Sequence, residues 1–473
     1  MRDLSSKEFK RIGYRLVDWI AEYLEDSERY PVLPKVHPGD VKAALPAQAP
    51  QAGESMDAIL NDFEQTLVPA LTHWNHPGFF AYFAISASAP GVLADFLSAA
   101  LNQQAMLWKT SPASTELEEV TLGWLRKGVG LSDAFEGVIY DTASIATLHG
   151  LAAAREATGL NIREKGLQQA PRLRVYCSEQ AHSSVDKAVI LLGLGQEGLR
   201  KIPVDQAFSM DPARLRAAIT EDRAQGWHPC AVVATVGTTS TTSVDPVPAI
   251  ASICETERLW LHVDAAYAGV AALVPEMAST LAGCERADSI VLNPHKWLMV
   301  PFDLSAFYCR RMDVVRQAFS LVPEYLRTEH DVNNLMDTGI QLGRRFRSLK
   351  LWMVMRYFGL DGLAAILREH VRMAQWLAEE VDKHPHFERM APTPFSVVCL
   401  RAHPPGTTDP DRLNEAIMDQ VNASGEVFLS HTKLHGQLVL RVAIGNQHTT
   451  WRHVRHLWSL LQEALHQQTA TVS

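Results

Sequence analysis

A single lysine stands in an apolar stretch near the middle of the chain. Lys296 lies in SIVLNPHKWLMVPFDLS, residues 289–305, where most neighbours are Val, Leu, Met, Trp, Pro or Phe. A lysine is rarely buried without a partner, because removing its ammonium group from water is costly. Its methylene stem can carry the charge back to water, or its desolvated amine can serve as a nucleophile. Lys296 alone does not separate these two readings.

Two more polar stretches each follow a predicted strand. After GVIY (137–140), Thr142-Ala143-Ser144 opens a predicted helix, whose N-terminal N–H groups suit a phosphate, although Thr142 could also be an ordinary N-cap. After LRVYC (173–177) comes His182, whose flat ring could stack on a flat ligand or be hydrogen-bonded within its loop. Ligands of parallel α/β sheets gather where strands end.

A carboxylate ends a third strand. LWLHVD finishes at Asp264, and Ala265 and Ala266 follow it. A carboxylate at that place needs a cation or strong hydrogen-bond donors to remain ionised, so it could form a structural salt bridge. The small residues beside it leave room for a ring.

Taken together, the stretches match the needs of pyridoxal 5'-phosphate. The set comprises a phosphate cradle, a stacking imidazole, a strand-end carboxylate and a lysine 32 residues after that carboxylate. The lysine amine can form a Schiff base with the cofactor's aldehyde. The carboxylate can keep the pyridine nitrogen protonated, which makes the ring an electron acceptor.

The elements that would position these groups alternate between strands and helices from residue 86 to 360. Apolar strands separated by helices predict a mainly parallel sheet covered on both faces, within an α/β fold. The predicted strands are GVIY, LRVYC, CAVVATV, LWLHVD, SIVLN and SAFYC. Residues 361–473 mix helices with the strand candidates FSVVCL and LVLRVAI, which indicates a smaller C-terminal α/β domain.

Residues 1–85 begin with a predicted amphipathic helix. Ser5 and Glu8 form a possible capping box, and an apolar stripe follows at Phe9, Ile12, Leu16, Ile20 and Leu24. This stripe needs cover, from a partner subunit or from its own domain. The Pro-rich residues 31–53 are predicted to be an extended connector.

Composition narrows the class of protein. The 473 residues carry a net charge of −9 with no run of Lys or Arg, which argues against nucleic acid or a membrane surface as partner. No apolar stretch is long enough to span a bilayer, and MRDLSSKEFKR lacks the apolar core of a signal peptide. The six cysteines are scattered without metal spacing, so reduced thiols in a cytoplasmic protein are expected.

Several of these motifs resemble one known family. HVDAAYAG, NPHKW, DTAS, AHSSVDKA and LGRRFRSLKLW (342–352) are similar to the group II pyridoxal-phosphate decarboxylases, above all the aromatic-L-amino-acid decarboxylases. The resemblance covers nearly the whole chain. It implies the PLP-dependent transferase fold (fold type I), with a mainly parallel seven-stranded sheet in a large domain. It also implies a homodimer with the active site at the interface, in which the helical segment 1–85 packs across the dimer.

The resemblance assigns roles to individual residues. Lys296 would be the Schiff-base lysine, Asp264 the partner of the pyridine nitrogen and His182 the stacking ring. Ala266 would contact the ring, and Thr239 would support Asp264 or the cofactor. The phosphate would lie among Ala143, Ser144, Asn293 and His295. The substrate pocket would include Trp74, Tyr82, Phe83, Ala84 and Gly343, with Met106 reaching it across the subunit boundary.

The family also carries a tyrosine on a mobile loop, here residues 320–334 with Tyr325. That tyrosine protonates the substrate Cα, whereas relatives with Phe there tend to be aldehyde synthases. The resemblance therefore implies decarboxylation of an aromatic L-amino acid (tryptophan, 5-hydroxytryptophan, DOPA, tyrosine or phenylalanine) to an arylalkylamine and CO2.

Other readings stay open. Ala84-Ile85, Ile145 and His149 depart from the usual family residues, which leaves the pocket shape open, while Gly343 makes room for a large ring. The alternatives are an aldehyde synthase, a PLP decarboxylase of a non-aromatic acid such as glutamate or diaminobutyrate, and a non-catalytic relative. A nicotinamide-binding Rossmann enzyme is disfavoured because no GxGxxG follows the first strand.

Overall fold

The computed structural model describes residues 3–321 and 332–470. The chain forms two compact units. One contains the residues through Ala84 together with Val381–Glu388 and the residues from Leu400 onward. The other contains Ile85–Glu380 and Arg389–Cys399. The division into segments 1–85, 86–360 and 361–473 stays a prediction.

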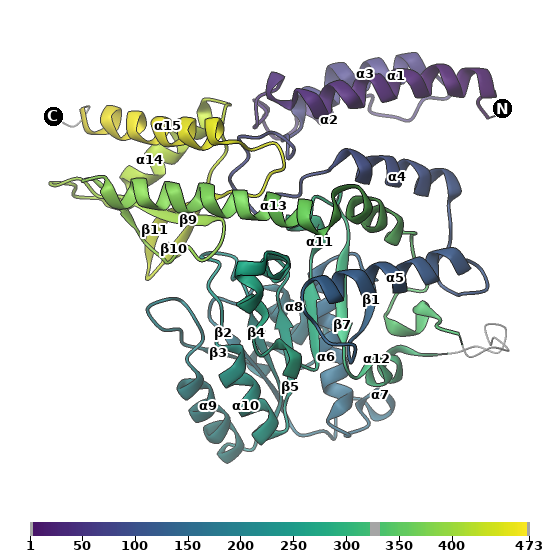
Figure 1. Ribbon diagram of the computed structural model, residues 1–473, viewed down its shortest axis with the longest axis vertical. Coiled ribbons are helices and arrows are strands. Elements are labelled where there is room, and N and C mark those ends of the chain that lie inside the picture. The colour runs from purple at the N-terminus through teal and green to yellow at the C-terminus, as the bar shows by residue number, and fades with distance from the viewer. Residues whose placement is uncertain (1–2, 322–331, 471–473) are drawn as a thin grey trace. The chain divides into compact units, whose positions relative to one another are not determined.

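The larger unit is built around a seven-stranded sheet in the order β1-β7-β6-β5-β4-β2-β3 (Figure 1). Strands β3, β2, β4, β5 and β6 run parallel, and β7 is antiparallel to both of its neighbours. The mainly parallel seven-stranded sheet is therefore confirmed. The strands are β1 (Glu136–Tyr140), β2 (Leu173–Ser178), β3 (Leu199–Ile202), β4 (His228–Thr235), β5 (Trp260–Asp264), β6 (Ser289–Leu292) and β7 (Ser305–Cys309).

The strands form because apolar runs of four to eight residues can be buried on both faces of the sheet. Every residue of β5, β6 and β7 is buried. Helix α6 (Ala143–Ala157) packs along β4 to β7, and α8 (Ser184–Leu191) and α12 (Met312–Phe319) pack against α6. Helices α9 (Pro212–Ala224) and α10 (Val247–Glu257) pack on β4.

The smaller unit begins with α1 (Ser6–Glu25). The Ser5 hydroxyl accepts the Glu8 N–H at 3.2 Å, so the Ser5 half of the predicted capping box is confirmed, while the Glu8 carboxylate accepts from Arg11. Of the apolar stripe, Ile12 is buried, the three later positions are half-buried and Phe9 is exposed. The Pro-rich stretch is not extended throughout, because Gly39 introduces a short helix, α2 (Asp40–Ala44).

A four-stranded sheet has the order β10-β11-β9-β8. Its strands are β8 (Phe387–Arg389), β9 (Val397–Ala402), β10 (Ser430–Leu434) and β11 (Gln437–Ala443). Helices α14 (Pro410–Ala423) and α15 (Trp451–Ala470) pack together. Among these elements, β9, β11 and α15 match the predicted candidates, whereas β8, β10 and α14 were not predicted. Within residues 3–321 and 332–470, no helix has the length and apolar character needed to cross a membrane.

Candidate active site

The predicted cofactor residues gather at one edge of the seven-stranded sheet. Because β2, β4, β5 and β6 are parallel, their carboxyl ends meet at the same edge. β1 is parallel to β6 through the antiparallel β7 between them, so its carboxyl end reaches that edge too. The segments that leave these five ends carry Thr142, His182, Thr239, Asp264 and Asn293. The edge is therefore the candidate cofactor site.

Asp264, His182 and Lys296 influence one another electrostatically. Burial lowers the pKa of His182, the positive charge of Lys296 lowers it further, and the carboxylate of Asp264 opposes the shift. These charges act on the imidazole because both lie close to it. The Ser184 N–H donates to His182 Nδ1 at 3.1 Å, so a neutral His182 ring carries its proton on Nε2. The structure thus brings together the carboxylate, the ring and the amine that the sequence singled out.

The carboxylate of Asp264 is held in place at the end of β5. Asp264 is buried, and its Oδ1 accepts the N–H of Ala266 at 3.1 Å. Ala266 in turn is tied to the next strand end, because its carbonyl accepts the Asn293 N–H at 3.0 Å. The small side chains of Ala265 and Ala266 leave this part of the edge uncrowded, as a planar ring beside Asp264 requires.

Asn293 and His295 present two donors that cannot satisfy each other. The Leu304 N–H donates to His295 Nδ1 at 3.0 Å, which leaves the proton of the neutral ring on Nε2. The Ser305 hydroxyl donates to Asn293 Oδ1, so the amide nitrogen of Asn293 is the group that lies 3.5 Å from His295 Nε2. Two N–H groups that face each other need an acceptor between them. A phosphate group meets that need, and these residues therefore fit the cofactor.

Helix α6 adds a second source of donors. It begins at Ala143 directly after β1, and the side chain of its N-cap, Thr142, makes no capping hydrogen bond. The first-turn N–H groups are therefore not occupied by the cap, and the positive end of the helix favours an anion. Ala143 is half-buried and Ser144 is exposed at this point. Thr239, in the turn after β4, is exposed as well.

Lys296 is positioned by the residue that follows it. Short helix α11 (Pro294–Trp297) begins right after β6, and within it Lys296 is half-buried. Trp297 is fully buried, stacks on Tyr267 at a ring-centroid distance of 4.6 Å, and donates its indole N–H to His370 Nδ1 at 3.0 Å. Because Tyr267 and His370 both fix the position of Trp297, the backbone of the preceding residue, Lys296, is fixed as well.

The structure adds Thr235 to the residues of this edge. Thr235 pairs with Asp264 in the β4–β5 register, so their side chains point to the same face. Thr235 is buried, and its hydroxyl has no hydrogen-bond partner among the residues that the structure describes. The sequence contains no signal for this pairing, because strand register depends on how two separate segments align.

The predicted substrate-pocket residues fall into two groups. Met106 and Gly343 lie in the larger unit, where Ala105 and Arg344, their chain neighbours, hydrogen-bond to each other. Trp74, Tyr82, Phe83 and Ala84 lie in the smaller unit. There Trp74 stacks with Tyr82 at 6.0 Å, and Arg441 covers the ring of Phe83 at 4.7 Å. Tyr325 lies outside the described residues.

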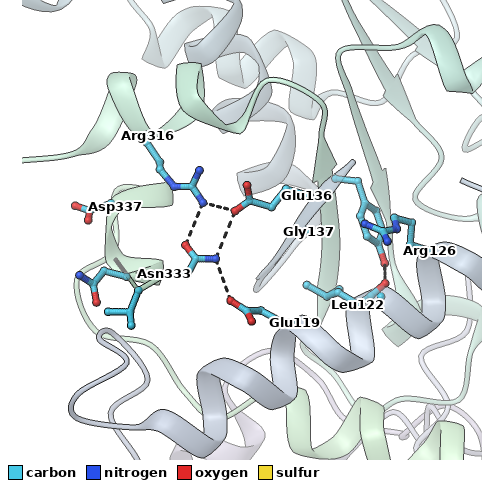
Figure 2. A pocket seen from close by; sticks show the side chains of 12 residues that line it. Glu119, Leu122, Arg126, Glu136, Gly137, Arg316, Asn333 and Asp337 are labelled. Atoms are coloured by element: carbon cyan, nitrogen blue, oxygen red, sulfur yellow. Dashed lines mark hydrogen bonds and ion pairs between the residues drawn. The ribbon is translucent and has the colours of Figure 1, made fainter. Parts of the chain in front are cut away.

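A polar cavity of about 660 Å³ lies at the other end of β1 (Figure 2). It begins at Glu136, the first residue of β1, and so belongs to the edge opposite the one that carries Asp264. Arg316 donates to Glu136 and, at 3.0 Å, to Asn333; Asn333 also donates to Glu119 at 3.2 Å. This network joins α12 and Asn333 to β1 and is not the cofactor site.

The comparisons with known proteins agree with this geometry. Residues 38–403 match the family model described as the pyridoxal-dependent decarboxylase conserved domain. Tryptophan decarboxylase 2 of Oryza sativa subsp. japonica is 39% identical, over 98% of this chain and 95% of its own. Phenylacetaldehyde synthase of Arabidopsis thaliana is 38% identical over 98% and 97%. Aromatic-L-amino-acid decarboxylase of Sus scrofa is 41% identical over 96% of both chains.

Solved structures give the same result. The crystal structure of Oryza sativa TDC with PLP and tryptamine has a TM-score of 0.95 and 36% identity, covering 99% of each chain. Catharanthus roseus tryptophan decarboxylase in complex with L-tryptophan has a TM-score of 0.93 and 35% identity, covering 99% of this chain and all of that one. The cofactor edge, the sheet order and these matches lead to one conclusion: the chain belongs to the pyridoxal-dependent decarboxylase family.

Proposed function

We propose that this chain is a pyridoxal-phosphate-dependent decarboxylase of aromatic L-amino acids, producing an arylalkylamine and CO2. The observation that carries the proposal is the grouping of Asp264, His182 and Lys296 at one edge of the sheet. Support for the substrate class comes from relatives named for tryptophan, tyrosine and aromatic L-amino acids, each matched over nearly its full length.

When bound, pyridoxal 5'-phosphate supplies a covalent attachment for the substrate amine and a ring that accepts the electron pair left behind by CO2. Asp264 would hold the proton on the pyridine nitrogen. His182 would cover one face of the ring, and its neutral state avoids placing a cation against that ring. Asn293 and His295 would bind the phosphate. The amine of Lys296 would hold the cofactor before substrate arrives and take it back when the amine product leaves.

The substrate side chain requires an aromatic surface. Within the smaller unit Trp74, Tyr82 and Phe83 would offer one, and the fully buried Phe79 supports Trp74 by stacking on it at 4.4 Å. A glutamate or diaminobutyrate enzyme would instead need a charged group in the wall of the pocket. Under this proposal Tyr325 delivers the proton to Cα.

A second candidate is an aldehyde synthase, because phenylacetaldehyde synthase is nearly as similar to this chain as the decarboxylases are. In that reaction oxygen is consumed and the product is an aldehyde. The tyrosine at position 325 favours the amine.

The proposed assembly is a homodimer with the active site at the interface. Exposed apolar residues support it: α4 (Ala89–Leu101) presents Leu93, Phe96, Leu97 and Leu101 at helical spacing, and such a stripe is typical of a covered face. Light scattering of the purified protein would measure the mass, and a monomer of 52.5 kDa would contradict the proposal. A cytoplasmic location is also proposed, supported by six buried cysteines that are present as thiols.

The test incubates the purified holoenzyme with a panel of aromatic and acidic L-amino acids, with products identified by mass spectrometry and oxygen followed in parallel. Amine and CO2 from aromatic substrates alone, without oxygen uptake, are expected. Aldehyde with oxygen uptake would establish the second candidate. Turnover of acidic substrates only would contradict both.

A further inference from the structure

A buried ion pair joins the two chain segments that carry Met106 and Gly343. Arg344 Nη2 lies 2.7 Å from Glu118 Oε1, and the exposed fractions of the two side chains are 7% and 2%. Glu118 belongs to α5 (Pro112–Gly128). Both partners also bind the same residue of β1: Arg344 donates to the Ile139 carbonyl at 2.8 Å, and Glu118 accepts the Ile139 N–H at 2.8 Å. The pair is therefore anchored to the sheet.

Arg344 binds the other segment as well. Its guanidinium donates to the Ala105 carbonyl at 3.3 Å, and its own carbonyl accepts the Ala105 N–H at 2.8 Å. Its backbone N–H donates to the side-chain oxygen of Gln104 at 2.7 Å. Residues 104–105 and 343–344 are thus joined by three hydrogen bonds, directly beside Met106 and Gly343.

The two segments lie close together. A Cβ added at Gly343 would lie 3.2 Å from the side-chain nitrogen of Gln104, closer than ordinary contact. On its other side the Met106 carbonyl accepts the Met336 N–H at 3.1 Å. A shift of a few tenths of an ångström in Arg344 would move both Gly343 and Met106. Pocket walls that discriminate between rings differing by a hydroxyl or a few carbon atoms depend on shifts of this size.

We propose that Arg344 and Glu118 are positioning residues that fix the segment carrying Gly343 and the segment carrying Met106, which serves the pocket across the subunit boundary. Through both segments they would set the choice among aromatic substrates. The inference rests on the proposed function. Neither residue needs to touch the substrate. The planar guanidinium matches the carboxylate and two carbonyls at once, and a lysine could not reproduce this geometry. Buried polar groups in other proteins are also known to fix a register at some cost in stability.

The experiment compares Arg344→Lys and Glu118→Gln with the wild type. It measures kcat and KM for tryptophan, tyrosine, DOPA and phenylalanine, together with the absorbance of the bound cofactor. We expect the ratio of kcat/KM for the substrate with the largest ring to kcat/KM for the substrate with the smallest ring to change by about 10-fold. Most of this change should lie in KM, and the cofactor spectrum should stay unchanged. A uniform loss for all four substrates would show that the pair only stabilises the fold and would overturn the proposal.

Arg200→Lys is the matched control. Arg200 also pairs with a fully buried carboxylate, Asp222, at 2.8 Å, but it stands on β3 at the far side of the sheet from β1. Its substitution is expected to leave the substrate ratios unchanged. If the ion-pair variants do not fold, Gln104→Ala provides the test, because Gln104 is exposed and its side chain accepts the Arg344 N–H. Unchanged kcat/KM ratios among the four substrates in Gln104→Ala would also overturn the proposal. A wild type inactive on every aromatic substrate would contradict the proposed function instead.

Discussion

The cofactor edge and the joined segments that carry Met106 and Gly343 (called the wall below) are built in different ways. At the cofactor edge, Asp264 directly ends a strand, and Asn293, His295 and Lys296 follow the next strand within four residues. The wall is assembled from distant segments: Arg344 reaches Glu118 across 226 positions and Ala105 across 239. A group beside a strand end is placed by the sheet itself, whereas the wall is placed by an ion pair. We therefore expect the chemistry to depend on the first region and selectivity on the second.

The strongest test of the first region is Lys296→Ala. Loss of the amine should remove covalent attachment of the cofactor and reduce kcat by at least about 10³-fold, a loss typical of removing a nucleophile. Absorbance spectra with added pyridoxal phosphate would measure the attachment, and a coupled CO2 assay the rate. Lys187→Ala, on helix α8, is the control. Near-normal turnover by Lys296→Ala would contradict the assignment of Lys296 as the residue that binds the cofactor covalently.

Tyr325→Phe tests a residue that belongs to neither region and that we expect to decide whether the product is an amine or an aldehyde. The substitution keeps the ring and deletes the hydroxyl that we expect to protonate Cα, so product should shift from amine toward aldehyde with oxygen uptake. Mass spectrometry of the products and an oxygen electrode would record the shift. An unchanged amine yield would mean that another group delivers the proton.

Glu118→Ala tests how much the buried ion pair of the second region contributes to the stability of the protein. It leaves Arg344 buried without its carboxylate, which should cost about 3–5 kcal/mol in the free energy of unfolding. Glu221→Ala breaks the exposed Arg200–Glu221 pair and should cost roughly 0–1 kcal/mol. Denaturant titration of the two holoenzymes at equal protein and cofactor concentration gives both values. Equal costs would show that the burial of the Arg344–Glu118 pair has no energetic consequence.

The smallest effect at neutral pH is expected from His149, which contacts the chain just before Gly343. The Ile340 N–H donates to His149 Nε2 at 3.4 Å, and burial lowers the pKa of His149 to about 3. The unfolded chain, with a histidine pKa near 6.5, takes up a proton that the folded state excludes. Above pH 6.5 His149 is neutral in both states, so its titration does not change the stability. Below pH 6.5 it lowers the free energy of unfolding by about 1.4 kcal/mol per pH unit, down to about pH 3.

His149→Leu should accordingly flatten the pH dependence of the free energy of unfolding below pH 6.5. Denaturant titrations of wild type and variant at several pH values between 4 and 8 would show it. His466→Gln alters an exposed histidine of α15 and provides the control. Parallel curves for wild type and His149→Leu would mean that His149 takes up its proton equally in the folded and unfolded states and would contradict the prediction.

Much of the sheet could be predicted from apolar runs. The six strands predicted in the larger unit all form, with ends within two residues of the prediction. Strand β3 was missed, because LRKI carries two cations and is buried only in part. Helix α2 was missed within a Pro-rich stretch, where Gly39 in a left-handed conformation (φ 105°) permits a helix to start.

The sequence by itself determined which chemical groups lie beside strand ends, because covalent neighbours of a parallel strand share its edge. Asp264, His182, Asn293 and Lys296 could be grouped on that basis. Only the tertiary structure decided which side chains face each other across separate segments. The Thr235–Asp264 register and the Arg344–Glu118 pair depend on how strands align and helices pack. Such pairings minimise the free energy of the whole fold, and no local spacing of residues encodes them.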